Sequence, residues 1–156
     1  MSKVKLLYIQ WLFVLLYIPF TSSCKDDLEA YAEAEITSVG AYHRYYTTEK
    51  DALTGEFKVA EKELEKSNTI NADAGTVTAT FTLPVSGGSF TDEERTKVSL
   101  SRLVVYFNVS TAVRVMPIEG SPRLGTPGDW TSEHRYIVTA ADGTQKTWTV
   151  KVALNK

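Results

Sequence analysis

The chain has 156 residues, with 17 Lys and Arg against 19 Asp and Glu, which gives a formal net charge of −2. This balance argues against binding to nucleic acid or to an anionic membrane surface, because both need a basic excess. The length suits one domain with a sizeable core. Cys24 is the only cysteine, so no intramolecular disulfide can support that core.

The N-terminus has the composition of a secretory signal. Lys3 and Lys5 precede an apolar run over residues 6–20, and small polar residues follow up to position 23. This order is typical of a cleaved signal peptide. A transmembrane anchor is the alternative, but the run is shorter than the roughly 20 residues that span a bilayer comfortably. We predict that residues 1–23 are removed, which leaves 15 basic residues against 19 acidic ones, a formal charge of −4.

Cys24 follows the small residues directly, and the stretch TSSC over residues 21–24 resembles the lipobox of bacterial lipoproteins. The resemblance implies that a diacylglycerol is attached to the Cys24 thiol. Several acyl chains, at about 0.8 kcal/mol per buried CH2, would then anchor the protein in a membrane. The alternative is an ordinary signal peptide that leaves a free cysteine, which would have no disulfide partner in the chain.

Charged residues follow the predicted lipid site at once. Lys25, Asp26 and Asp27 come directly after the cysteine, and this sequence resembles the export signal that sends Bacteroidota lipoproteins to the outer face of the outer membrane. The resemblance implies surface exposure, whereas the charge alone would make residues 24–35 a solvated tether. We expect this lipidated tether to precede a single folded domain over residues 36–156.

The first region after the tether favours strands. A period of two divides the segment AYHRYY into one face with Tyr42, Arg44 and Tyr46 and another with His43 and Tyr45. Because adjacent tyrosines point to opposite faces, a sheet with one buried face must expose one of them. The following segment, FKVAEKELEK, fits either strand alternation or a helical face. We predict a strand pair over residues 36–67.

Exposed aromatic rings in this region are candidate contacts for a ligand or partner. Tyr42 and Tyr46 would present such rings with Arg44 between them, and exposed rings can stack on sugars or anchor a protein interface. Trp130, in a predicted loop, is a further candidate contact. The alternative for all of them is packing, either under the tether or residues 48–66, or over the end of the domain.

Two later segments follow a period of two. In TVTATFTL and LVVYFNV every second residue is apolar, which predicts strands with one buried face over residues 76–83 and 103–109. Val113 and Val115 extend the second alternation as far as Pro117. Strands spaced in this way between turn signals suggest an antiparallel sandwich.

The C-terminal segment RYIVTAADGTQKTWTVKVAL predicts a hairpin whose register depends on its turn. A two-residue turn at Asp142 and Gly143 would pair Ile137 with Trp148 and place the apolar residues of the two strands on opposite faces. A three-residue loop, with Gly143 in the left-handed conformation, pairs Tyr136 with Trp148 and aligns them. We predict the three-residue loop.

The same hairpin carries a family resemblance. Its sequence YIVTAADGTQKTWTV closely matches the Tyr-x-Val-Thr-Ala-x-Asp-Gly-x-x-Lys-x-aromatic-x-Val ending of immunoglobulin-like domains in Bacteroidota surface lipoproteins. With the upstream segment LSRLVVYFNVSTAVRVMP and the pair DW, the match covers about residues 70–153. The resemblance implies an all-β, antiparallel immunoglobulin-like β-sandwich at the cell surface. It says little about the ligand, because one fold serves many functions.

Few residues favour catalysis. His43 and His134 are 91 positions apart with no metal-ligand spacing around either, so we expect no metal centre and no cofactor. The acids at 92–94 could bind calcium or act as glycosidase carboxylates, but adjacent acids of this kind are more often a solvated loop. We expect a protein that is not an enzyme.

Three functions remain open. The resemblance implies a surface-anchored accessory lipoprotein that assists outer-membrane uptake of a glycan or peptide beside a TonB-dependent importer complex. The chain could instead be a carbohydrate-binding module that uses Tyr42, Tyr46 and Trp130, or an interaction subunit that binds a protein by a sheet edge. A flat row of exposed aromatics would favour sugar, whereas an apolar patch with a bare strand edge would favour a protein partner.

Overall fold

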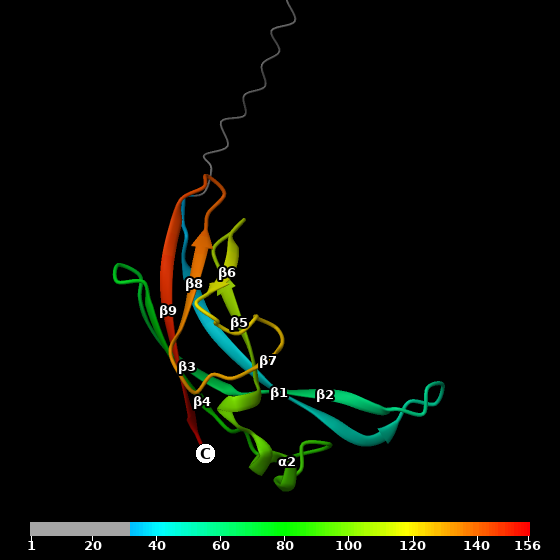
Figure 1. Cartoon of the computed structure of the whole chain (residues 1–156). Helices are drawn as coiled ribbons and strands as arrows, with labels where there is room; N and C mark the ends of the chain where they lie inside the picture. Colours follow the sequence, from blue (N-terminus) through cyan, green and yellow to red (C-terminus); the bar gives the residue numbers. More distant parts are fainter. Residues whose placement is uncertain (1–31) are drawn as a thin grey trace, which may run out of the picture.

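A computed structural model describes residues 32–156, which form two packed β-sheets (Figure 1). The predicted signal peptide, Cys24, Lys25, Asp26 and Asp27 lie outside the described residues. The strands are β1 (Ile36–Lys50), β2 (Phe57–Glu63), β3 (Glu65–Asn71), β4 (Thr76–Thr82), β5 (Leu103–Val109), β6 (Arg114–Ile118), β7 (Pro127–Gly128), β8 (His134–Thr139) and β9 (Gln145–Asn155). The helical segments are α2 (Asp92–Lys97) and the 3-10 turn η1 (Leu100–Arg102).

The predicted all-β sandwich is confirmed. One sheet has the strand order β2-β1-β5-β7 and the other has the order β3-β4-β9-β8-β6. Among the described strands, neighbours run antiparallel except for β4 and β9, which run parallel. The second sheet is therefore mixed, where the sequence predicted antiparallel pairing throughout. Parallel neighbours need a long crossover connection, and the chain supplies one by passing through α2 and the other sheet between β4 and β9.

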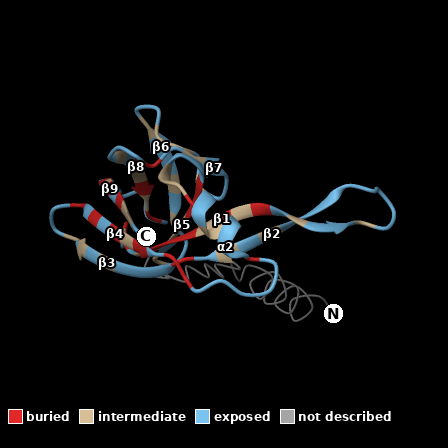
Figure 2. Ribbon diagram, turned by 90° about the horizontal axis from the view of Figure 1, so that it is seen from below, coloured by how far each residue is buried: buried red, intermediate tan, exposed pale blue. Residues whose placement is uncertain are grey.

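The core lies between the two sheets and is lined by alternate residues of the strands (Figure 2). In β4, Val77, Ala79 and Phe81 are buried, whereas the threonines between them face outward. The predicted alternation of residues 76–83 is confirmed. β5 departs from the predicted alternation at its start, because Leu103, Val104 and Val105 are all buried.

The end of β5 differs from the prediction. The alternation was expected to continue through Val113 and Val115, but β5 ends at Val109 and the chain reverses near Ala112, whose φ is +60°. β6 then pairs with β8 in the other sheet, with Val115 opposite Val138. A positive φ at a non-glycine residue marks a turn, and hydrophobic alternation does not reveal it.

The C-terminal hairpin has the predicted register. Tyr136 lies opposite Trp148, and the Ala140 N–H donates to the Thr144 carbonyl at 2.8 Å across a three-residue loop. Gly143 has a φ of +90°, in the left-handed region that such a loop requires. Both aromatic side chains are fully buried, so the loop length places them in the same core.

The described end of the tether packs against the sandwich. Ala34 is buried, and its carbonyl accepts a hydrogen bond from Trp148 Nε1 at 2.9 Å. The Ser110 hydroxyl donates to the Glu33 carbonyl and accepts from the Glu35 N–H. These bonds fix the point at which the N-terminal segment leaves the body of the domain.

The strand pair predicted after the tether is confirmed. The pair consists of β1 and β2, which run antiparallel with Tyr42 opposite Glu63, and the segment FKVAEKELEK also supplies the start of β3 in the other sheet. Buried Leu64 stands at the corner between β2 and β3, and its N–H donates to the Ala41 carbonyl at 3.0 Å. The helical alternative is therefore wrong, because strands lie on both sides of Leu64.

Candidate functional site

The alternation predicted for the segment AYHRYY is confirmed. His43 and Tyr45 are only 7% and 8% exposed, and their rings lie 6.3 and 5.9 Å from that of Phe90. Tyr46, on the opposite face of β1, is 69% exposed. Phe90 comes from the connection that follows β4, so a distant segment decides which of the adjacent tyrosines is buried.

The other two residues on the outward face of β1 are held by neighbours. Tyr42 stacks on Tyr106 with ring centroids 5.1 Å apart, and Arg44 forms an ion pair with Glu61, with Nη2 2.6 Å from Oε1. Tyr106 itself lies over Gly40, where a Cβ atom would come within 2.1 Å of the ring. The face therefore gathers Tyr42, Arg44 and Tyr46 as predicted, but only the Tyr46 ring is largely free.

Trp130 does not lie at the surface, so its predicted role as a ligand or partner contact is wrong. The side chain is 0% exposed and stacks on Tyr136 at 6.2 Å. Asp129 accepts hydrogen bonds from the Thr131 N–H and hydroxyl, and the Trp130 N–H donates to the Leu100 carbonyl at 2.8 Å. These bonds hold the loop with the indole facing the core, which is the packing alternative.

The acids at 92–94 form the first turn of α2 rather than the predicted loop. The Thr91 hydroxyl accepts the Glu94 N–H at 3.2 Å and caps the helix. Lys97 forms ion pairs with Glu93 at 3.0 Å and with Glu94 at 2.7 Å. The sequence signal for this helix is the Thr-x-x-Glu spacing of a capping box.

Exposed apolar side chains gather on the arm, which is the part of the β1–β2 hairpin formed by residues 46–59. Of the six large apolar side chains exposed among the described residues, four lie on the arm: Tyr46, Leu53, Phe57 and Val59. Tyr46 pairs with Val59 across the hairpin, and Phe57 lies on the same face as Val59 because it is two residues away. Tyr46, Val59 and Phe57 form an apolar strip on a hairpin that projects from the sandwich (Figures 1 and 2).

Neither edge of the arm has a partner strand within residues 32–156. β2 is the outermost strand of its sheet, and β1 pairs with β5 only as far as Tyr42. Beyond that point each edge presents unpaired backbone N–H and C=O groups, which can pair with another chain.

The tip of the arm is held in one conformation by Asp51. Its Oδ1 accepts the N–H groups of Leu53 and Thr54 at 2.9 and 3.0 Å, and the Gly55 N–H donates to the Asp51 carbonyl at 2.9 Å. The hydrogen bonds from Thr54 and Leu53 lower the pKa of the Asp51 carboxyl. The turn thus fixes the position of Leu53, which is 96% exposed.

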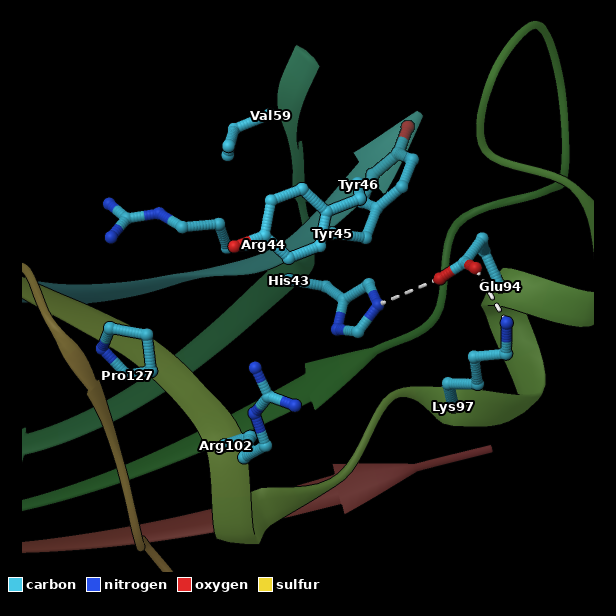
Figure 3. A pocket seen from close by; sticks show the side chains of 9 residues that line it. All are labelled: His43, Arg44, Tyr45, Tyr46, Val59, Glu94, Lys97, Arg102 and Pro127. Carbon is cyan, nitrogen blue, oxygen red and sulfur yellow. Dashed lines mark hydrogen bonds and ion pairs between the residues drawn. The ribbon is translucent and has the colours of Figure 1, made fainter. Parts of the chain in front are cut away.

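A hollow of about 480 Å³ lies at the base of the arm (Figure 3). It occurs where β1 continues past the start of β5, so residues from both faces of β1 border it. Its lining residues are His43, Arg44, Tyr45, Tyr46, Val59, Glu94, Lys97, Arg102 and Pro127. The hollow could not be recognised from the sequence, because α2, η1 and β7 reach β1 only in the folded chain.

His43 is the buried polar group of the hollow. Its Nε2 atom is closed to solvent, has no hydrogen-bond partner among the described residues, and lies 3.7 Å from Glu94 Oε2. Burial lowers the pKa of the His43 imidazole, Glu94 opposes this change, and the Arg102 and Lys97 charges add to it. The bond from Lys97 lowers the pKa of Glu94. Near neutral pH the hollow therefore holds a neutral imidazole beside an ionised carboxylate.

Residues 32–156 contain no group of three His, Cys, Asp or Glu side chains placed to hold a metal ion. None of the helices in this part of the chain is long and apolar enough to cross a membrane.

Comparisons with known proteins place the chain in a family. The family described as DUF5018-related matches residues 36–151. The solved structure of a "putative secreted protein" from Bacteroides fragilis is 65% identical with a TM-score of 0.76, over 81% of this chain and 99% of that chain. A "putative glycoside hydrolase" from Bacteroides thetaiotaomicron is 22% identical with a TM-score of 0.45, over 81% of this chain and 26% of that chain. No functionally curated protein matches. The chain belongs to the DUF5018-related family.

Proposed function

We propose that the protein is a surface-anchored, non-enzymatic lipoprotein that acts as an accessory binding and assembly module in outer-membrane nutrient uptake. Its arm docks onto a protein partner, such as a subunit of a TonB-dependent importer complex. One observation carries this proposal: the arm combines an apolar strip, two bare strand edges and a tip held in place by Asp51.

The arrangement of the aromatic residues favours a protein partner over a glycan. A sugar platform needs a row of free rings, but Tyr42 is stacked on Tyr106, and the Tyr106 hydroxyl donates to Glu63 at 2.6 Å. Only Tyr46 offers a largely free ring on this face. An apolar strip beside a bare edge is the pattern expected for a protein that adds a strand or covers the face.

A partner would also stabilise the arm itself. A two-stranded hairpin with no further strands is at best marginally stable in water, and the arm has no third strand within the described residues. A partner strand would satisfy the backbone groups of one edge, and burial of the apolar strip would add to the stability.

The arm lies far from the N-terminal segment. β1 has 15 residues, which span about 50 Å when extended, and the N-terminal segment leaves at its first residue whereas the arm tip follows its last (Figure 1). With a lipid on Cys24, this geometry directs the arm away from the end of the body that faces the membrane. A docking surface in that position is open to a partner.

The lipid anchor is supported by the sequence of residues 21–24, and secretion is supported by the similarity to a "putative secreted protein". Labelled palmitate should be incorporated into the wild-type chain in a Bacteroidota host and not into Cys24→Ala. Equal labelling of the variant would contradict lipidation. Replacement of Lys25, Asp26 and Asp27 by alanine should keep the label but protect the protein from external protease in intact cells.

We propose no catalytic role for the hollow. A general base must reach the proton that it removes, directly or through one water, whereas the His43 Nε2 atom is closed to solvent and faces Glu94.

Docking by the arm is tested with a photo-crosslinking amino acid at Tyr46 in intact cells. We expect a covalent link to one defined outer-membrane protein, and we expect Phe57→Ser and Val59→Ser to reduce it strongly. The matched control is the same probe at Thr69, an exposed position on the edge strand of the other sheet. Identical products at both positions would refute docking by the arm, and products made only with polysaccharide would favour the glycan alternative.

A further inference from the structure

Arg102 is the cation of the hollow that has no carboxylate partner within residues 32–156. The other two cations are paired, Arg44 with Glu61 and Lys97 with Glu94. Arg102 lies on η1 and its guanidinium extends into the hollow (Figure 3). A guanidinium presents a fork of N–H donors that matches the two oxygens of a carboxylate.

His43 provides a second, independent observation. Its side chain is more than nine-tenths buried, and its Nε2 atom makes no hydrogen bond with any described residue. One ring nitrogen faces Glu94, and the other lies on the side of Arg102 (Figure 3). The Nε2 atom is closed to solvent and faces Glu94, so an oxygen atom held between the imidazole and the guanidinium would contact the other ring nitrogen.

The rim of the hollow is apolar. Tyr46 presents its exposed ring there, and Val59 and Pro127 complete the border. A volume of about 480 Å³ lies in the range of about 300 to 1,000 Å³ that is usual for small-ligand sites. A sugar ring has a C–H face that can pack on tyrosine, so a charged sugar matches both the rim and the interior.

The charge of the hollow limits the ligand to one negative charge. Lys97 neutralises Glu94 through an ion pair at 2.7 Å, and a single guanidinium remains to balance an anion. A second negative charge would lie close to the Glu94 carboxylate and be repelled. A carboxylate therefore fits better than a phosphate dianion.

We propose that the hollow binds a carboxylate-bearing sugar residue, with the Arg102 guanidinium as its counter-ion and the Tyr46 ring against its apolar face. The site borders the apolar strip and shares Tyr46 and Val59 with it, but its carboxylate contacts would be Arg102 and His43 rather than Phe57 or Leu53.

The test compares two sugars that differ in one group. D-Galacturonate carries a carboxylate where D-galactose carries a hydroxymethyl group, and both are titrated into the purified full chain by calorimetry. We expect galacturonate to bind at least about tenfold more tightly, as a charge-assisted hydrogen-bonded pair allows. Arg102→Gln should reduce galacturonate binding to the galactose level. Arg123→Gln, which removes the same charge from an exposed arginine outside the hollow, should bind like wild type.

A second measurement does not depend on any variant. The NMR signals of the His43 imidazole should move when galacturonate is added, whereas those of His134, which is outside the hollow, should not. Equal affinities for the two sugars, or full binding by a folded Arg102→Gln variant, would overturn the proposal. Binding of a glutamate-containing peptide without binding of galacturonate would overturn the choice of a sugar. None of these results depends on the crosslink expected at Tyr46.

Discussion

The β8–β9 hairpin and the arm are closed by similar turns but have opposite surroundings. In the first, the Asp142 carboxylate accepts the Thr144 N–H at 2.8 Å; in the second, the Asp51 carboxylate accepts the Thr54 N–H at 3.0 Å. Each turn also contains a glycine with positive φ. The two connections differ in length, but in both of them backbone N–H groups donate to the aspartate carboxylate and lower its pKa.

The difference lies in what covers each hairpin. β8 and β9 have β6 and β4 as outer neighbours, and their inward residues are fully buried. The arm has no outer neighbour among the described strands, and its apolar strip faces outward. A turn can define a hairpin, but only tertiary contacts decide whether its apolar residues become core or remain available for a partner.

The largest expected effect is in the buried hairpin. Trp148→Ala should lower the free energy of unfolding by about 3 to 5 kcal/mol, because it leaves a cavity and removes the hydrogen bond to the Ala34 carbonyl. Denaturant unfolding measures this loss. A loss below about 1 kcal/mol would contradict the view that this hairpin belongs to a tightly packed core.

The region where β1 leaves the sandwich is the next test. Gly40→Ala should cost about 1 to 3 kcal/mol, because the new Cβ atom would meet the Tyr106 ring at 2.1 Å. Adding Tyr106→Ala to this variant should recover part of the stability. The control is Gly87→Ala, whose Cβ would meet nothing within 4 Å. Equal losses at both glycines would show that crowding by Tyr106 is not the cause.

A smaller effect is expected from His43 at the base of the arm. Burial lowers the pKa of the folded-state imidazole below its ordinary value of 6.5, with Glu94 opposing and Arg102 and Lys97 reinforcing the change. Between the folded and unfolded pKa values the unfolded chain binds more protons, so stability should fall as the pH drops below 6.5. Thermal melts across this window measure the effect. His43→Gln should flatten the dependence, and an unchanged slope would contradict it.

The part of the fold that the sequence predicted well is the part with local determinants. Alternation and turn chemistry were enough for β4 and for the pairing of Tyr136 with Trp148. The parallel pairing of β4 with β9, the burial of Trp130 and the position of Phe90 over Tyr45 depend on segments far apart in sequence. For the same reason the period of two placed Tyr42, Arg44 and Tyr46 on one face of the strand but did not reveal the hollow.

The smallest expected change in stability is at Tyr46, and it separates a docking surface from a packed one. Tyr46→Ala should alter the free energy of unfolding by no more than about 0.5 kcal/mol, because most of the ring is already in water. The adjacent variant Tyr45→Ala is the matched control and should cost about 3 kcal/mol or more, because that ring packs on Phe90 and its hydroxyl lies 3.0 Å from Ser89 Oγ.

The two variants should behave in the opposite way in binding assays. For this assay the photo-crosslinking amino acid is moved from position 46 to position 57. The Tyr46→Ala variant should then melt like wild type yet lose most of the product formed with the outer-membrane partner. Truncation of an exposed aromatic anchor can cost about 2 kcal/mol or more of binding energy, which is on the order of 30-fold in affinity. A large loss of stability in Tyr46→Ala would show that the strip is packed within the chain. Full retention of the product would show instead that the arm docks through its edges or through Leu53 at its tip.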